Sequence, residues 1–66
     1  MGSERIPYRG QCTFIVSPYR KGWHIDIEVD GELKGSYTHS EEPDGVPRQQ
    51  AIQEATRVAD GILAGQ

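Results

Sequence analysis

The sequence contains a single cysteine and no long apolar run. One cysteine cannot form an intramolecular disulfide, so we expect a reducing, cytoplasmic setting. A helix that spans a bilayer needs roughly 18 or more apolar residues in succession, and no segment approaches this. The first residues, Met1 to Arg5, also lack the apolar stretch of a secretory signal. These absences predict a protein that stays in the compartment where it is made, away from the membrane.

Positive charge is also limited. Seven Lys and Arg residues stand against ten Asp and Glu residues, which gives a formal net charge of −3. This balance argues against a general affinity for nucleic acid. The absence of a glycine-rich phosphate loop excludes the common nucleotide-dependent classes. We expect one domain, residues 1–66. A domain of this size buries only about 60% of the surface that its unfolded chain exposes, so its stability should be small. Oligomerisation is the remaining way to increase that stability.

The clearest pattern is the alternation of apolar and polar residues from Trp23 to Val29. A period of two is typical of a strand with one buried and one exposed face. We predict that a three-residue turn, residues 29–31 with a G1 bulge, connects this strand to a second one. This turn places Leu33 and Tyr37 on the buried face, whereas a two-residue turn would place both on the polar face.

The three-residue turn also predicts the pairing within the hairpin. The expected pairs are Ile27 with Leu33, Ile25 with Gly35 and Trp23 with Tyr37 on the apolar face, and Asp26 with Lys34 and Glu28 with Glu32 on the polar face. The last pair is repulsive, at a cost of a few tenths of a kcal/mol.

Three segments surround this hairpin. Residues 8–16 alternate with their even positions apolar, which predicts another strand, and Ser17–Gly22 reads as a hairpin loop. Residues 1–7 show no period and include a proline that cannot donate to a ladder, so we expect a frayed terminus. Residues 38–46 are rich in turn formers and acids, and are expected to form a connecting loop.

A helix is predicted from about residue 47 to about residue 64. Pro47 suits the first helical turn, and Gly65 suits a left-handed stop. Apolar residues recur at spacings of three and four and define one stripe: Ala51, Ile52, Ala55, Val58, Ala59, Ile62 and Leu63. This stripe should pack on the apolar face of the sheet, made by Cys12, Phe14, Val16, Trp23, Ile25, Ile27, Leu33 and Tyr37.

The predicted fold is therefore α+β, a three-stranded antiparallel meander with one C-terminal helix packed on one face (βββα). Such a sheet has two edges. Natural proteins rarely leave long edges open, so we expect edge pairing into a homodimer or with a strand of a partner protein.

Candidates for chemistry are few. Alternation places Cys12 on the face under the helix and His24 on the other, so the two should not meet, and Cys12 should be a buried structural thiol. Three acids follow His39, namely Glu41, Glu42 and Asp44. Their spacing matches no known set of metal ligands. The polar face of the predicted sheet holds three carboxylates, Asp26, Glu28 and Glu32. An acid–base pair needs a cleft that raises the pKa of one carboxyl, and a flat sheet offers none. We expect no enzymatic activity and no metal or cofactor.

Two sets of residues are candidates for binding. The first serves a protein partner, and it consists of Ile15, Tyr19, Arg20, Lys21 and His24. The second interleaves basic residues with tyrosines, as proteins do that clamp phosphates and stack on bases, and it consists of Arg5, Tyr8, Arg9, Tyr19, Arg20 and Lys21. The polar sheet face lacks a row of aromatic residues, so single-stranded nucleic-acid binding is the alternative and protein binding the main expectation.

Several short segments together resemble a known group. The residues are Tyr8-Arg9-Gly10, Gly22-Trp23-His24-Ile25-Asp26-Ile27, Gly35-Ser36-Tyr37, an acidic Pro-Asp-Gly loop and a helix with Ala51 through Ala55. This pattern is similar to the small stand-alone β-β-β-α proteins of unknown function found in proteobacteria. The resemblance covers most of the chain and implies a bacterial protein of this fold, but it supplies no activity, ligand or catalytic residue.

A second resemblance is to the N-terminal domains of HicB-type antitoxins, which run three strands and then a helix with a Glu-Ala motif. Glu54-Ala55 would take that part here. The chain departs from the pattern because it lacks an appended DNA-binding segment, and only Pro43 and Pro47 echo the proline-bearing approach to the helix. This resemblance implies toxin binding as a further alternative to a homodimeric, non-enzymatic interaction module.

Overall fold

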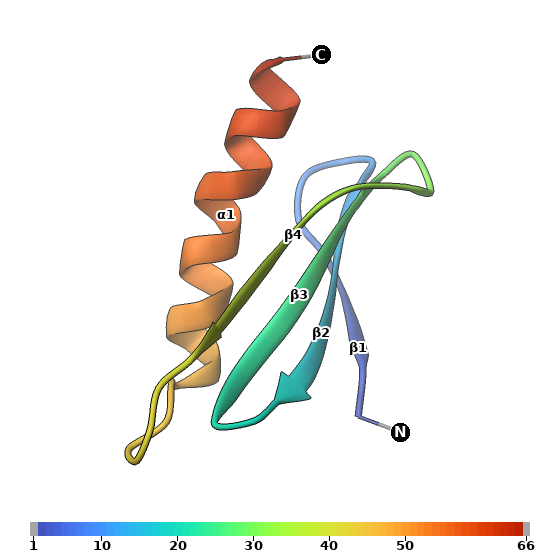
Figure 1. Ribbon diagram of the computed structural model, residues 1–66. Helices are drawn as coiled ribbons and strands as arrows, with labels where there is room; N and C mark the ends of the chain where they lie inside the picture. Colours follow the sequence, from blue (N-terminus) through green and yellow to red (C-terminus); the bar gives the residue numbers. More distant parts are fainter. Residues whose placement is uncertain (1, 66) are drawn as a thin grey trace.

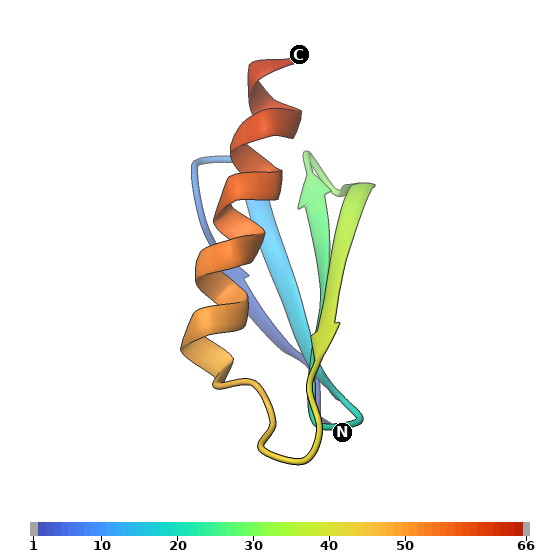
Figure 2. The same cartoon turned by 60° about the vertical axis from the view of Figure 1, so that its left-hand side comes forward.

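The computed structural model describes residues 2–65 and contains one sheet and one helix. The elements are β1 (Glu4–Pro7), β2 (Cys12–Tyr19), β3 (Gly22–Val29), β4 (Glu32–Ser40) and α1 (Arg48–Ala64). The strands pair antiparallel in the order β1-β2-β3-β4. Helix α1 lies on one side of the sheet only (Figure 1 and Figure 2), and it makes its close contacts mainly with β3 and β4. The α+β class, the antiparallel sheet and the C-terminal helix are confirmed, but the sheet has four strands, not three.

No helix within residues 2–65 has the length and apolar character needed to cross a membrane.

The additional strand is β1, where a frayed terminus was predicted. Its residue Ile6 pairs with Phe14 of β2 on the covered face. Glu4 forms an ion pair with Arg48, which ties the start of β1 to the start of α1. Pro7 lies opposite Thr13 at the outer edge of the sheet, where strands tolerate proline. The sequence pattern missed this strand because only one of its four residues is directed toward the core and apolar.

Strand β2 is displaced along the chain from the predicted segment 8–16. Residues before Cys12 form a turn, closed by hydrogen bonds from the Tyr8 amide to the Cys12 carbonyl (2.8 Å) and from the Cys12 amide to the Arg9 carbonyl (2.7 Å). At its other end β2 continues through Pro18 to Tyr19, so the predicted loop 17–22 shrinks to a two-residue turn. Proline fits here because β1 begins opposite Val16, so no residue of β1 lies opposite Pro18 to accept the N–H that proline lacks.

The β3–β4 connection is a two-residue turn, Asp30–Gly31, and the predicted three-residue turn is wrong. Val29 pairs with Glu32, and the φ angles of Asp30 (55°) and Gly31 (81°) are both positive, as a type I′ turn requires. The two-residue turn places Leu33 on the polar face, where it is 64% exposed. Leu33 is therefore not part of the core.

A β-bulge then restores the alternation on β4. Glu28 pairs with Leu33 but Ile27 pairs with Gly35, so Lys34 is an extra residue without a partner on β3. Beyond the bulge Ile25 lies opposite Tyr37, which confirms the covered face for Tyr37 by a route that differs from the predicted one.

The predicted hairpin pairs are all displaced by the turn and the bulge. The observed pairs are Ile27 with Gly35, Ile25 with Tyr37, Trp23 with His39 and Asp26 with Ser36. The expected polar neighbours are replaced by ion pairs of Lys34 with Glu32 and of Arg5 with Glu28.

The core lies between α1 and the covered face of the sheet. Its fully buried members are Cys12, Phe14, Val16, Ile25, Ile27, Val29, Ala51, Ala55 and Ala59, with Val46 close to full burial. Because the three alanines meet the sheet directly, the helix approaches it closely, and the larger apolar residues of the predicted stripe flank this contact.

The helix begins and ends where the sequence predicted, with Pro47 as its N-cap residue. Gly65 has a φ of −88°, so the predicted left-handed stop is wrong. Its N–H instead donates to the carbonyl groups of Gly61 and Ile62, which closes the last turn.

We expect Gly22→Ala to destabilise the protein by at least about 2 kcal/mol, because a Cβ at Gly22 would lie 1.8 Å from the carbonyl oxygen of His39 and separate β3 from β4. The free energy of unfolding from urea titration measures this. Gly61→Ala is the matched control, since a Cβ there meets nothing within 4 Å. In the helix that substitution should stabilise by up to about 1 kcal/mol. Equal effects of the two substitutions would contradict the close approach at Gly22.

Candidate interaction surface

The sheet face opposite α1 carries no second layer in the described part of the chain (Figure 1). Three of the residues predicted for a protein partner lie on it. Ile15 pairs with Asp26, and Tyr19 lies four residues further along the same face of β2. His24 of β3 lies opposite Ser17, between these two positions. The structure thus brings Ile15, Tyr19 and His24 together on one uncovered face.

His24 is held in a fixed orientation on this face. Its Nε2 lies 2.7 Å from Asp26 Oδ1, and its Nδ1 lies 2.6 Å from Thr38 Oγ1. Because a carboxylate only accepts, Nε2–H donates to Asp26 and the Thr38 hydroxyl donates to Nδ1. The His24 and Asp26 side chains are each 35% exposed on an open sheet, so water reaches both of them. Both ring nitrogens of His24 are thus engaged, which fixes the position of the imidazole on the polar face.

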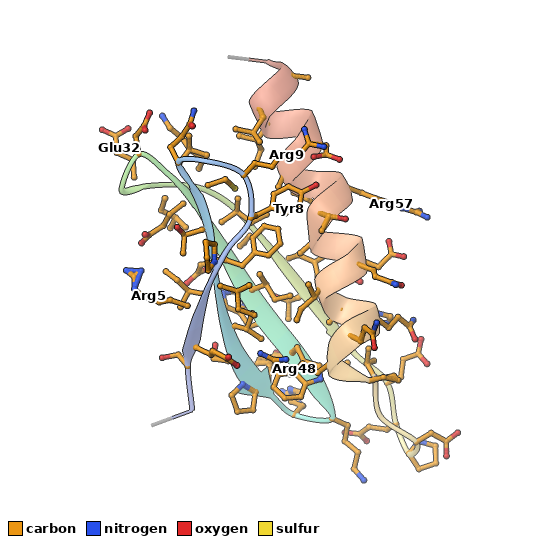
Figure 3. The ribbon with its side chains drawn as sticks, turned by 180° about the vertical axis from the view of Figure 1, so that it is seen from behind. Arg5, Tyr8, Arg9, Glu32, Arg48 and Arg57 are labelled. Carbon is orange, nitrogen blue, oxygen red and sulfur yellow. The ribbon has the colours of Figure 1, made fainter. Side chains whose placement is uncertain are left out.

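The residues predicted for nucleic-acid binding are divided between two ends of the sheet. Tyr8 and Arg9 lie in the β1–β2 turn beside α1, and Arg5 lies on the other side of the sheet (Figure 3). Tyr19, Arg20 and Lys21 lie at the far end of β2, roughly 20 Å away by the rise of a strand. The structure does not bring these six residues into one cluster.

Tyr8 is also occupied by contacts within the protein. Its ring stacks on Phe14, with 5.0 Å between ring centroids, and its hydroxyl donates to Asp60 at 2.8 Å. The hydrogen bond to Asp60 raises the pKa of Tyr8, with a smaller contribution from burial. The Arg9 guanidinium also lies over the ring, 5.4 Å from its centroid. A base stacking on Tyr8 would have to replace these contacts.

Most of the positive charge is paired. Of the seven basic residues, Arg5, Arg9, Lys34, Arg48 and Arg57 each have a carboxylate within 4 Å. Within residues 2–65, Arg20 and Lys21 are the two that form no such pair. The unneutralised positive charge is thus located at the β2–β3 turn.

Strand β4 forms a long open edge. In an antiparallel ladder, residues alternate between bonding to the neighbouring strand and directing N–H and C=O away from it. In a hairpin with a two-residue turn, the two residues that flank the turn exchange backbone hydrogen bonds. The backbone groups of Gly22 and His24 therefore bond to β2, and those of the odd-numbered residues of β3 bond to β4. Their partners are Gly35, Tyr37 and His39. The backbone groups of the intervening Ser36, Thr38 and Ser40 are consequently directed to the open edge.

The inner side of this strand carries a polar chain in place of the expected loop. The Tyr37 hydroxyl lies 3.0 Å from His39 Nδ1, and His39 Nε2 lies 3.0 Å from Glu41 Oε2. Nε2–H therefore donates to the carboxylate, and Tyr37 donates to Nδ1. Burial, followed by the charges of Glu54 and Glu41, raises the pKa of Tyr37. No group of three or more His, Cys, Asp or Glu among the described residues is arranged to hold a metal ion.

Sequence reasoning missed the backbone of the β4 edge as a candidate site. It ended the last strand at Tyr37, whereas the strand continues to Ser40. The continued alternation of Tyr37 and His39 with polar residues was the available signal, but the neighbouring turn formers obscured it.

Comparison of the chain with models of protein families, with curated proteins and with solved structures finds no match.

We expect Cys12 to react with DTNB at pH 8 at least about a hundredfold more slowly in the folded protein than in urea, because the thiol is fully buried and must await opening. Burial also raises the pKa of Cys12, which lowers the thiolate fraction that reacts. The control is Ser36→Cys combined with Cys12→Ser, which moves the single thiol to the exposed edge and should react promptly. Prompt labelling of native Cys12 would contradict a structural role.

Proposed function

We propose that this chain is a non-enzymatic protein-interaction module that forms a homodimer by antiparallel pairing of β4 with β4 of a second copy. The observation that carries the proposal is the open edge of β4, nine residues long, with a row of outward backbone groups. Such an edge is a template for another strand, and natural proteins cover or pair it. A chain of 66 residues with a small core also benefits from the added burial.

The opposite edge is less suited to this pairing. Strand β1 has only four residues and ends in Pro7, which has no N–H to donate. Lys34 and the bulge at the far end of β4 protect that part of the strand, but residues 35–40 beyond the bulge are regular. The segment from Ser36 to Ser40 is therefore the one available for regular pairing.

Charge supports an antiparallel arrangement of the two β4 strands. When the pairing is centred on Thr38, Ser36 of one copy lies opposite Ser40 of the other. Lys34 then approaches the acidic residues Glu41 and Glu42 that follow Ser40. The two-fold axis runs perpendicular to the sheet, so both helices lie on one face and the opposite faces join into one continuous polar surface. That surface, with Ile15, Tyr19 and His24 repeated on it, is the proposed contact area for other proteins.

We expect the wild-type protein to scatter light with twice the 7.3 kDa mass of one chain, and Ser36→Pro to shift it toward a single chain. The proline removes an outward N–H in both copies and leaves the bonds to β3 intact, since Ser36 does not bond to β3. Losing two backbone hydrogen bonds should raise the dimer dissociation constant at least about tenfold.

Two controls identify the edge. Ser36→Val keeps the N–H and should leave the dimer unchanged. Arg5→Pro places a proline at the corresponding outward position of β1, so it should also leave the dimer intact if β4 is the interface. Circular dichroism verifies that each variant is folded. A monomeric wild type, or dissociation by Arg5→Pro with Ser36→Pro still dimeric, would overturn the proposal.

A further inference from the structure

A hollow of about 710 Å³ lies where the β2–β3 turn meets the loop between β4 and α1. One side is formed by the turn, including Arg20 and Lys21, and the other by the loop, including Asp44 and Val46. Trp23 lies between them on the covered side of β3. The hollow is widely open to solvent and larger than a bare inorganic anion needs, so it can take part of a longer chain.

The shape of the hollow is set by hydrogen bonds between its two sides. Trp23 Nε1 donates to the Val46 carbonyl at 2.9 Å, and the Val46 amide donates to the Lys21 carbonyl at 3.0 Å. Lys21 Nζ donates to the Pro43 carbonyl at 3.2 Å. Because indole and backbone groups make the two bonds to Val46, the hollow exists before any ligand binds, which lowers the ordering cost of binding.

The lining combines apolar surface with unpaired positive charge. The apolar part comes from Trp23 and Val46 together with two prolines, Pro18 and Pro47. Arg20 and Lys21 lack a carboxylate within 4 Å in the described chain, and each uses only one of its donors on the protein. The Arg20 Nε–H donates to the Tyr19 hydroxyl at 3.3 Å, and the Arg20 guanidinium lies 5.6 Å from the Tyr19 ring centroid. These contacts hold the Arg20 guanidinium beside Tyr19, on the uncovered side of the sheet. The remaining N–H donors of Lys21 Nζ are the ones available to an anion in the hollow.

We propose that this hollow binds an acidic peptide segment, with a carboxylate on Lys21 and a neighbouring apolar side chain on Trp23 and Val46. Charge complementarity argues for the carboxylate, and the indole and proline surfaces argue for an apolar group beside it. Asp44 is the acid of the hollow and opposes the ligand's charge. This site does not depend on the β4 dimer, because all of its residues belong to one copy.

The test uses the fluorescence of Trp23, the single tryptophan of the chain. The probes are the blocked peptides acetyl-Leu-Glu-Leu-amide and acetyl-Leu-Gln-Leu-amide, and inorganic phosphate. We expect a saturable change with the Glu peptide, at least about fivefold weaker binding of the Gln peptide, and weaker binding of phosphate, which cannot use the apolar surface. Equal affinity for the Glu and Gln peptides, no saturable change, or tighter binding of phosphate than of the Glu peptide would overturn the proposal.

Three variants test where the carboxylate binds, because they should change the affinity for the Glu peptide in different directions. Lys21→Gln should weaken the Glu peptide by about fivefold, whereas Asp44→Asn should strengthen it by a similar factor. Partial unfolding does not produce a gain. Arg9→Gln is the matched control, since it removes the same charge in the β1–β2 turn, at the other end of the sheet and away from the β4 edge, and should leave the affinity unchanged. Equal weakening by Arg9→Gln, or no gain with Asp44→Asn, would contradict the site. The titration is repeated with Ser36→Pro. Because the hollow lies within one copy, the affinity for the Glu peptide should not change when the dimer dissociates.

Discussion

The bulge at Lys34 is the feature on which the rest of the structure depends. The type I′ turn before it places Leu33 on the polar face, and without an extra residue every later side chain of β4 would follow that register. The bulge reverses the alternation, so Gly35 and Tyr37 meet the helix. A Cβ at position 35 would lie 2.8 Å from Ile62 Cδ1, so the glycine matches the close helix at this point. One irregular residue thus reconciles a tight turn with a continuous core.

The close approach of the helix has a consequence for the other surfaces. Three small residues of α1 meet the sheet, and the helix packs mainly over β3 and β4. The covered face is thereby filled by one element, while the opposite face and the outer edge of β4 have no cover among the described residues (Figure 2). The same packing that completes the core therefore leaves the backbone of β4 available, which is the basis of the proposed homodimer.

The distribution of charge separates the two ends of the molecule. At the end with the β1–β2 turn, Arg9 and Tyr8 are engaged by Asp60 of the helix (Figure 3). At the opposite end, Arg20 and Lys21 form no carboxylate pair and lie beside Trp23 in the hollow. A net charge of −3 conceals this difference, since the acids are not spread evenly around the basic residues. Local pairing, and not the overall balance, decides where an anionic ligand is attracted.

The sequence by itself determined the helix, the alternating strand β3 and the burial of Cys12, because each depends on a period or parity that is local. It missed β1, since a short edge strand with one inward apolar residue has no period to detect. The sequence could not predict the length of the β3–β4 turn or the bulge, for a different reason. A two-residue and a three-residue turn are both compatible with Asp30–Gly31, and only the packing of Tyr37 beneath the helix selects the combination of tight turn and bulge. The same applies to the binding surfaces: the open edge and the hollow are made by segments distant in the chain, and only tertiary contacts bring those segments together.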